Sequence, residues 1–342
     1  MSVDEARKVV DTARSAGMFP AATAEVGSSA GPIWTEAFGT STDTPFDLAS
    51  LTKVIATTTV IMELMRTGAL RLEHRVSESF KEWRGADREA VTVRDLLEHT
   101  GGLSARLLDA PPQGRREFEH DISTMPLEYA PRTRSIYSDL GFILLGFLAA
   151  DRGGSPLADQ FEKAVTWIDS DALAFELPQE ERARAAPTRP MEDDHRRGRA
   201  LVGEVHDPYA AALGGVAGHA GLFGTVSAVG AFARAVLRAA RGTGDRFPDP
   251  LTPALVRTFT TKSTVYGSSR ALGWDTMLPT SSCGTRMTSE AFGHVGYTGT
   301  SLWIDPTRDR YFVLLTNRVF GLGTLEEIRS VRRAFHDAFA DV

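Results

Sequence analysis

Segments with strand character lie at the two ends of the chain, and helices and loops fill the part between them. Near the N-terminus, residues 21–27 and 33–38 read as two strands joined by a Ser/Gly/Pro turn. Near the C-terminus, four more strands are predicted, at residues 271–277, 291–296, 301–305 and 311–316. Strands from both ends are expected to meet in one antiparallel sheet around a shared core. We therefore predict an α+β fold in which residues 1–75 and 212–342 form the sheet with its flanking helices, and residues 76–211 form a mainly helical insertion.

The strongest helix prediction covers residues 50–67, where apolar side chains recur at helical spacing until Gly68 ends the pattern. Residues 179–199 are polar and rich in Arg, Glu and Asp, so they are predicted to form a solvated loop or mobile flap. Further helices are predicted at residues 4–16, 92–97, 140–151, 226–241, 253–261 and 325–340.

Composition and charge exclude several classes of function. The 342 residues are 42% hydrophobic and 24% charged, with a formal charge of −6 and no basic stripe, so nucleic acid is not an expected partner. No apolar stretch approaches the ~20 residues that cross a bilayer, so no membrane contact is expected either. The N-terminus lacks a basic segment followed by an apolar run, which predicts no signal peptide and a cytoplasmic location. The expected partner is a small-molecule acyl substrate, and the sequence carries no signal for the oligomeric state.

The chemistry centres on Ser50 and Lys53 at the start of the strongest predicted helix. Residues three apart on a helix share one face, so the hydroxyl and the amine lie within hydrogen-bond reach. A serine hydroxyl becomes a good nucleophile when a base takes its proton. Lys53 can be that base if its pKa falls from ~10.4 toward neutrality. The alternative is a surface serine and a surface lysine, but Lys53 interrupts an apolar, Thr-rich helix where an unpaired lysine is costly.

Two further segments carry polar groups that suit this chemistry. Tyr137 and Asp139 directly precede an apolar helix, and a tyrosine near a lysine can relay a proton. His294, Gly296 and Tyr297 lie on the predicted strand pair, where a glycine lets another backbone approach and the next N–H can stabilise an oxyanion. An ordinary half-buried tyrosine, and a satisfied histidine beside a Gly-rich turn, explain the same residues without a function.

Other candidate sites fit the sequence less well. Residues 27–31 (Gly-Ser-Ser-Ala-Gly) match the Gly-x-Ser-x-Gly nucleophile pattern, but a strand follows them, which favours a hairpin turn. Cys283 lies in a predicted loop without a partner base, and as a single cysteine it excludes an internal disulfide. The glycines of residues 215–224 do not fit a phosphate-binding fingerprint. His206, Asp207 and His219 lack metal-ligand spacing, so no metal and no cofactor are expected.

Taken together, these segments resemble the serine β-lactamase and penicillin-binding-protein superfamily, with its Ser-x-x-Lys, Tyr-x-Asn and Lys-Thr-Gly elements. The likeness is greatest to the class C β-lactamase branch, which includes DD-peptidases, D-aminopeptidases and family VIII carboxylesterases. Residues 96–103 (Leu-Leu-Glu-His-Thr-Gly-Gly-Leu) are similar to its "LLxHTSGL" segment. Residues 214–224 (Gly-Gly-Val-Ala-Gly-His-Ala-Gly-Leu-Phe-Gly) resemble its "GGVAGHAGLFST" segment. The order and spacing agree over residues 21–340.

The resemblance implies a role for each residue. Ser50 would form an acyl-enzyme, Lys53 would accept the serine proton, and Tyr137 would help to protonate the leaving group. The backbone N–H groups of Ser50 and Tyr297 would form the oxyanion hole. His294 stands where many relatives have the lysine of Lys-Thr-Gly. A histidine at this position is common in the esterase and D-aminopeptidase-like members.

Asp139 stands where relatives have an asparagine, so it cannot donate as an amide does, and it would instead pair with Lys53 or another cation. The predicted function is a serine hydrolase that acts mainly as a carboxylesterase. The alternatives are a D-Ala-D-Ala carboxypeptidase or D-aminopeptidase, a weak β-lactamase, and a non-catalytic penicillin-binding sensor module.

Overall fold

The computed structural model describes residues 3–107, 111–168 and 172–339. Its helices and strands follow one another as α1 Val3–Ser15, β1 Ala22–Ser28, β2 Gly31–Phe38, β3 Phe46–Asp47, η1 Lys53–Thr57, α2 Thr58–Arg66, α3 Val76–Ser79, α4 Val93–Leu97, α5 Arg115–Thr124, α6 Asp139–Gly153, α7 Leu157–Ala164, β4 Leu173–Ala174, α8 Gln179–Arg184, α9 Pro208–Ala212, β5 Phe223–Gly224, α10 Val226–Arg241, α11 Pro253–Thr260, β6 Asp275–Thr276, β7 Phe292–Val295, β8 Ser301–Asp305, β9 Arg310–Thr316, η2 Arg318–Phe320 and α12 Leu325–Ala338.

One six-stranded antiparallel sheet joins the two ends of the chain, in the order β2-β1-β9-β8-β7-β6. β1 pairs with β9 in the register Ala22↔Thr316, so the N-terminal hairpin adds directly to the C-terminal strands. The predicted fold class is therefore confirmed. The turn at Ser29 and Ala30 joins β1 to β2, which confirms the hairpin reading of residues 27–31.

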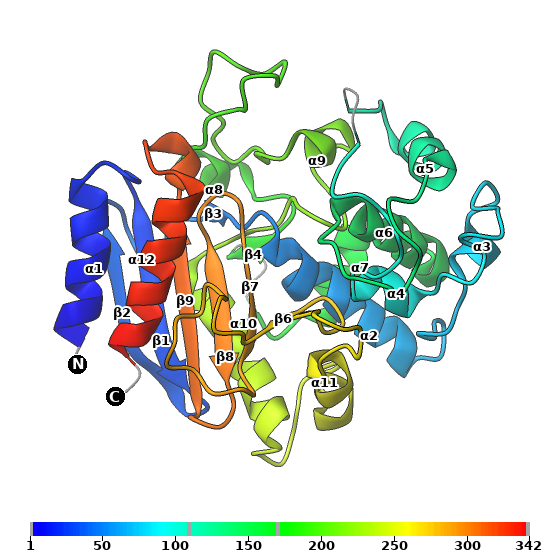
Figure 1. Cartoon of the computed structure of the whole chain (residues 1–342). Helices are drawn as coiled ribbons and strands as arrows, with labels where there is room; N and C mark the ends of the chain where they lie inside the picture. Colours follow the sequence, from blue (N-terminus) through cyan, green and yellow to red (C-terminus); the bar gives the residue numbers. More distant parts are fainter. Residues whose placement is uncertain (1–2, 108–110, 169–171, 340–342) are drawn as a thin grey trace.

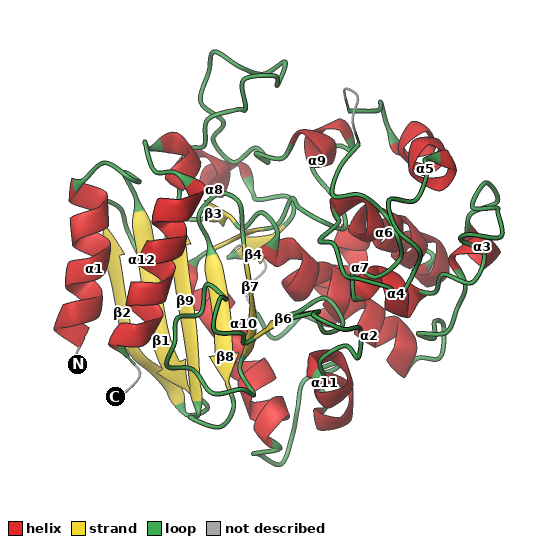
Figure 2. Ribbon diagram, viewed as in Figure 1, coloured by secondary structure: helices red, strands yellow, loops and turns green. Residues whose placement is uncertain are grey.

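Helices cover both faces of the sheet (Figure 1). α1 and α12 lie side by side on the outer face, where Val10, Phe335 and other apolar side chains bury the aromatic residues of the strands. α10 covers the inner face and contacts β1, β8 and β9. Figure 2 shows α2 to α7, α9 and α11 on the side of the molecule away from α1 and α12, while α8 lies near the upper end of α12.

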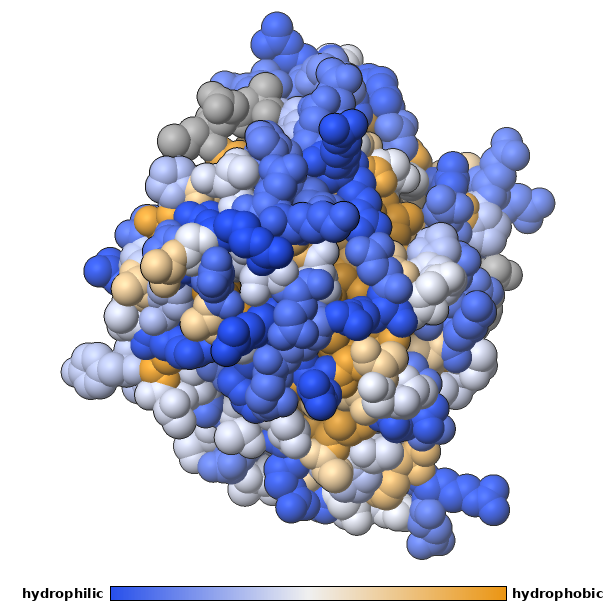
Figure 3. All heavy atoms as spheres, turned by 90° about the vertical axis from the view of Figure 1, so that its right-hand side faces the viewer, coloured by the Kyte–Doolittle hydropathy of each residue, from blue (hydrophilic) through white to orange (hydrophobic). Residues whose placement is uncertain are grey.

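The helical part shares its core with the inner face of the sheet. One buried apolar cluster includes Leu144 of α6, Phe232 of α10 and Val313 of β9. η1 and α2 pack against α6 and α7 as well, so the division at residues 75 and 211 stays a prediction. The face of this part that Figure 3 shows is largely hydrophilic, with a band of hydrophobic side chains exposed between the charged ones. Within the described ranges, no helix has the length and apolar character that a bilayer span requires.

Three predicted segments differ in detail. The strand predicted at residues 271–277 is only two residues long, because Gly273 has φ 86° and the Ala271 N–H donates to Trp274 O in a turn. The helix predicted at residues 50–67 contains the π-helical turn η1, in which the Thr58 N–H donates to Lys53 O. Such turns widen a helix locally and often lie at functional sites.

Residues 179–199 are not simply a solvated loop. They contain α8, and the Asp194 side chain beyond it is fully buried. Arg196 bonds Asp194 Oδ2 at 2.6 Å and also donates to Val205 O and His206 O. The polar composition of residues 179–199 predicted that their charges would be solvated. Asp194 and Arg196 instead pair with each other inside the protein.

Candidate active site

Ser50 lies at the end of a short connection that two distant segments hold in place. The Leu48 N–H donates to Leu222 O at 2.9 Å. Thr298 Oγ1 and Thr300 Oγ1 donate to Asp47 O and Leu48 O at 2.8 and 3.0 Å. Ala49 takes φ 47°, a conformation that L-residues rarely adopt and that often marks a functional site. The chain thus turns sharply just before Ser50 and enters the helical turn with Lys53.

The Ser50 hydroxyl accepts hydrogen bonds from two predicted proton carriers. Lys53 Nζ donates to Ser50 Oγ at 3.1 Å, and Tyr137 OH donates to it at 2.7 Å. Tyr137 comes from the segment before α6, and its ring lies 4.9 Å from Lys53 Nζ. The three side chains that the sequence predicted to act together are therefore in mutual contact.

Lys53 is fully buried, and its ammonium has three acceptors for its three N–H groups. Besides Ser50 Oγ, these are Asp139 Oδ1 at 2.8 Å and His219 O at 3.0 Å. Burial lowers the pKa of Lys53, but the Asp139 carboxylate and Tyr137 together outweigh it, so the net shift is upward. The expected fall toward neutrality is therefore wrong for the resting enzyme. The expectation that Asp139 pairs with a cation is confirmed.

Behind Lys53 a chain of charges continues through the helical part. Arg106 bridges Asp139 Oδ2 at 3.4 Å and Asp207 Oδ2 at 3.2 Å. His219 Nε2 contacts Asp207 Oδ1 at 2.8 Å, and the pKa of Asp207 falls because its bonds to His219 and Arg106 outweigh burial. His219 and Asp207 thus serve this network. The described residues contain no group of three His, Cys, Asp or Glu side chains suited to a metal.

The two glycine-rich segments that resemble the class C branch hold the catalytic side chains. His99 Nδ1 accepts the Ser138 N–H at 3.0 Å, and its ring stacks 4.8 Å from the Tyr137 ring. At Gly218, a Cβ would meet Phe142 O at 2.0 Å, so only glycine lets this loop press against α6. That close approach brings the neighbouring His219 carbonyl to Lys53.

His294 lies on β7 beside Tyr137, with ring centroids 5.8 Å apart, and is buried. Burial, with the charges of Arg270 and Lys53, holds the pKa of His294 well below its usual value, so the ring is neutral. Its Nδ1 lies 2.9 Å from Val295 O, which can only accept, so Nδ1 carries the proton. Nε2 is then an acceptor, so the His294 ring brings no positive charge to the pocket.

Gly296 and Tyr297 follow β7 and face Ser50. A Cβ on Gly296 would meet Leu48 O at 2.6 Å and Thr300 Oγ1 at 2.1 Å, so the glycine is needed for packing against the nucleophile segment. The sequence interpretation assigned it instead to substrate approach. Among the described contacts, the N–H groups of Ser50 and Tyr297 have no protein acceptor. Both donors are thus available where the resemblance expects an oxyanion hole.

These residues surround a pocket of about 260 Å³. Two of its lining residues, Arg270 and Arg332, were not predicted from the sequence, because they lie outside every motif. The Arg270 guanidinium lies 5.2 Å from the Tyr137 ring and 4.0 Å from its acidic neighbour, Asp275 Oδ1. Lys53 and Asp139 do not line the pocket and lie behind Ser50 and Tyr137. The lining residues are Ser50, Tyr137, Arg270, Asp275, His294, Val295, Gly296, Tyr297, Leu325 and Arg332.

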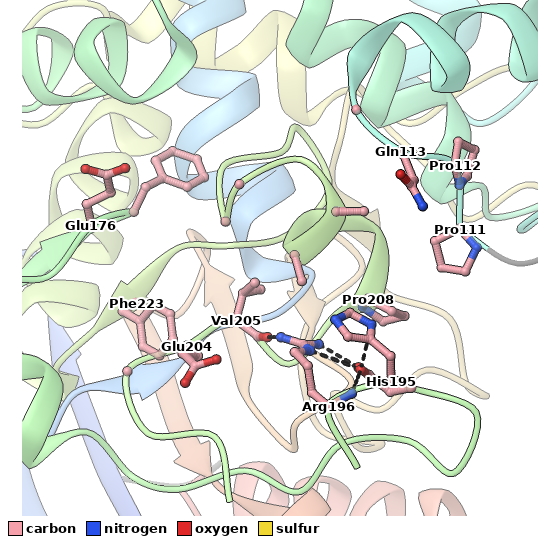
Figure 4. Close-up of a pocket in the computed structure, with 18 of the residues that line it drawn as sticks. Pro111, Pro112, Gln113, Glu176, His195, Arg196, Glu204, Val205, Pro208 and Phe223 are labelled. Atoms are coloured by element: carbon pink, nitrogen blue, oxygen red, sulfur yellow. Dashed lines mark hydrogen bonds and ion pairs between the residues drawn. The ribbon is translucent and has the colours of Figure 1, made fainter. Parts of the chain in front are cut away.

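A larger cavity of about 830 Å³ opens in the helical part. Figure 4 shows it between a loop that carries His195, Arg196 and Glu204 and a second loop with Pro111 and Gln113. Among its described lining residues there is no serine, cysteine or lysine. The smaller pocket at Ser50 is therefore the better candidate for acyl chemistry.

Cys283 does not fit a nucleophile's role in the structure. It is fully buried, and burial raises its pKa to about 12. A thiol with such a pKa stays protonated at neutral pH and reacts poorly. Ser50 is thus the nucleophile candidate that combines contact with a base, a pocket and free N–H donors.

Comparison with known proteins places this arrangement in a family. The family model described as Beta-lactamase matches residues 6–334. A putative D-alanyl-D-alanine carboxypeptidase of Escherichia coli K12 is 30% identical over 308 residues, covering 81% of this chain and 70% of that protein. An N-acetylmuramyl-L-alanine amidase of Bacillus subtilis 168 is 30% identical over 306 residues, covering 81% of this chain and 68% of that protein.

Solved structures agree in fold. A β-lactamase/D-alanine carboxypeptidase from Pseudomonas syringae superposes with a TM-score of 0.76 at 16% identity, covering 98% of both chains. EstCE1, described as a hydrolase with promiscuous acyltransferase activity, gives a TM-score of 0.74 at 18% identity, covering 97% of this chain and 98% of that one. The chain therefore belongs to the beta-lactamase family and is a serine hydrolase with the fold of the class C enzymes.

Proposed function

We propose that this enzyme hydrolyses small carboxylic esters through an acyl-enzyme on Ser50. The observation that carries the proposal is the pair of hydrogen bonds that Ser50 Oγ accepts from Lys53 Nζ and Tyr137 OH. An activated serine needs a base within hydrogen-bond reach and an oriented second group, and this pair supplies both.

The reaction begins from the minor form in which Lys53 is neutral. Ser50 Oγ attacks the acyl carbon while its proton passes to Lys53 Nζ, and the N–H groups of Ser50 and Tyr297 stabilise the oxyanion. Tyr137 then gives its proton to the leaving alkoxide and regains one from Lys53. Water, deprotonated by the same groups, attacks the acyl-enzyme and releases the acid. Each proton taken from a nucleophile is thus returned to a leaving group.

The neutral ring of His294 favours esters over substrates with a carboxylate beside the scissile bond. Penicillins, cephalosporins and D-Ala-D-Ala peptides carry such a carboxylate. Without a cation at position 294, they lose a charge-assisted hydrogen bond of about 1.5–3 kcal/mol. Small neutral esters lose nothing by this change.

Arg270 supports a second candidate function, which is hydrolysis of carboxylate-bearing amides or β-lactams. Its guanidinium lines the Ser50 pocket, and its side chain is only 19% exposed. Its acidic neighbour, Asp275, lies at the outer limit of an ion pair, so the positive charge remains available to a substrate anion. The relatives named above as a D-alanyl-D-alanine carboxypeptidase and an N-acetylmuramyl-L-alanine amidase carry the names of enzymes that cleave amide bonds.

Side-by-side kinetics separate these two functions. We expect kcat/KM for p-nitrophenyl butyrate to exceed that for nitrocefin at pH 8, with no gain for nitrocefin at pH 6, because His294 stays neutral. Arg270→Met should lower kcat/KM for nitrocefin by roughly 10- to 100-fold. It should leave the neutral ester within about threefold. A higher kcat/KM for nitrocefin than for the ester in the wild-type enzyme at pH 8 would establish the second function instead.

The Asp139 carboxylate predicts an unusual pH dependence. Activity needs neutral Lys53, so kcat/KM should rise with pH through the raised pKa of Lys53. Asp139→Asn removes a charge that raises this pKa, so the rising limb should move to lower pH. Ester kinetics followed up to about pH 11.5, with the hydroxide-catalysed background subtracted, measure the shift.

The matched control is Asp275→Asn, which removes a carboxylate from the pocket wall but none that contacts Lys53. Its rising limb should stay where the wild-type limb is. A limb that does not move in Asp139→Asn would mean that Lys53 is not the group whose titration limits the rate.

A further inference from the structure

The peptide group between Gly296 and Tyr297 carries one of the two proposed oxyanion donors. A trans peptide is planar, and its C=O and N–H point in opposite directions. Whatever fixes the Gly296 carbonyl therefore also aims the Tyr297 N–H. Two groups hold this carbonyl: the Gly299 N–H donates to Gly296 O at 3.1 Å, and Nη2 of Arg332 on α12 donates to it at 2.8 Å.

Arg332 is an unusual partner for a carbonyl. It is 5% exposed, and among the described residues no carboxylate pairs with it. Its Nη2 also donates to Thr300 O at 2.8 Å, while its Nε is buried without an acceptor. Burial and the neighbouring Arg318 lower its pKa to about 9, which leaves it largely charged at neutral pH. A buried charge without a counter-ion is costly. In the described contacts of Arg332, peptide carbonyls and no carboxylate compensate its charge.

A second arginine fixes the next carbonyl in the same way. Arg318 Nη2 donates to Tyr297 O at 2.6 Å, and its guanidinium lies 4.9 Å from the Tyr297 ring. His206 stacks on the same ring with centroids 5.6 Å apart. The Gly296 carbonyl also accepts the Gly299 N–H of its own turn at 3.1 Å, so Arg332 is the charged donor, and the only side-chain donor among the described contacts, on the peptide group that carries the Tyr297 N–H.

We propose that Arg332 is a positioning residue for the oxyanion hole: its guanidinium, bound to Gly296 O, orients and polarises the peptide whose Tyr297 N–H stabilises the oxyanion. This inference rests on the proposed acyl-enzyme at Ser50. Hydrogen bonds to a charged group are about twice as strong as neutral ones, and bonded peptide groups polarise one another. A cation on the carbonyl oxygen therefore makes the N–H of the same group a better donor.

The test is the carbonyl stretch of the acyl-enzyme, measured by infrared difference spectroscopy with a ¹³C-labelled acyl group. In the wild-type enzyme the strong oxyanion donors should shift this band to low wavenumber. Arg332→Met should move it to higher wavenumber and lower kcat for p-nitrophenyl butyrate by roughly 10- to 100-fold, with KM little changed. Arg332→Lys, which keeps the charge, should retain most of the wild-type band position and rate.

Arg333→Met is the matched control. Arg333 lies on the same helix, but it donates to Ser281 O and Pro279 O at the surface. The Arg333→Met variant should have the carbonyl band at the wild-type wavenumber and the wild-type kcat. Only molecules that are folded and acylated contribute to the band, so partial unfolding of a variant lowers the intensity of the band and not its position. Arg332→Gln, which keeps one donor without the charge, gives a second reading if the methionine variant does not fold.

Two failures are distinguishable. If wild-type enzyme forms no acyl adduct by intact mass, the proposed function is overturned, and this inference falls with it. If the wild-type enzyme acylates and both Arg332→Met and Arg332→Gln keep the wild-type band position and kcat, Arg332 does not act on the oxyanion hole.

Discussion

Ser50→Ala should abolish the acyl-enzyme and lower ester turnover by ~10³-fold or more. Both Lys53 Nζ and Tyr137 OH donate to this hydroxyl, so its loss leaves two proton carriers without a nucleophile. Intact-mass spectrometry after brief exposure to a slow ester or a fluorophosphonate should show one adduct on the wild-type enzyme and none on the variant.

Ser29→Ala is the control for this experiment. Ser29 belongs to residues 27–31, which match another nucleophile pattern, yet it lies in the β1–β2 turn and bonds Asp309. Its replacement should leave both the adduct and the turnover at wild-type levels. An adduct that persists on Ser50→Ala and disappears on Ser29→Ala would reverse the assignment.

Lys53→Met should be almost as damaging as Ser50→Ala. It removes the proposed proton acceptor, and the double variant should be no worse than either single one, because groups that act as a unit lose their effect together. Steady-state ester kinetics of the three variants, normalised to folded protein, measure this. Turnover that falls by less than about tenfold in Lys53→Met would exclude it as the base.

Loss of Lys53 also leaves the Asp139 carboxylate in a buried site with Arg106 as its remaining partner. Removing one member of a buried ion pair typically costs about 3–5 kcal/mol of stability. Lys53→Met combined with Asp139→Asn removes both charges and should recover much of the melting temperature without any activity. This pair of measurements separates lost chemistry from lost folding.

The parts of the site that the sequence predicted are those fixed by short spacing. Ser50 and Lys53 lie three residues apart at a helix start, so helical geometry alone brings them together. Strand patterns at the two ends were enough to predict the antiparallel sheet, because few other arrangements bury six strands. Tyr137 and Tyr297 were candidates from their local sequence, but joining them to Ser50 required the resemblance, since local sequence does not indicate which distant groups they approach.

What the sequence did not predict depends on contacts between distant segments. Burial lowers the pKa of Lys53, but the Asp139 carboxylate 2.8 Å away and Tyr137 raise it, so the net shift is upward. Arg270 and Arg332 reach the pocket through tertiary packing and belong to no motif. The sequence predicted a solvated Asp194, because nothing in the polar segment 179–199 indicates that Arg196 pairs with it inside the protein.

The pairing of β1 with β9 sets an order of events during synthesis on the ribosome. The N-terminal hairpin emerges early, but a two-stranded hairpin is only marginally stable, and its second neighbour is Arg310–Thr316 near the other end. Pairings between such distant segments also form slowly. Ser50 and Lys53 are therefore made long before the segment that carries Gly296 and Tyr297, and a chain released early by premature termination lacks both the completed sheet and the oxyanion donor. Catalytic competence therefore requires synthesis to continue past Tyr297 and through β9, and products that end before Arg310 should show no ester turnover.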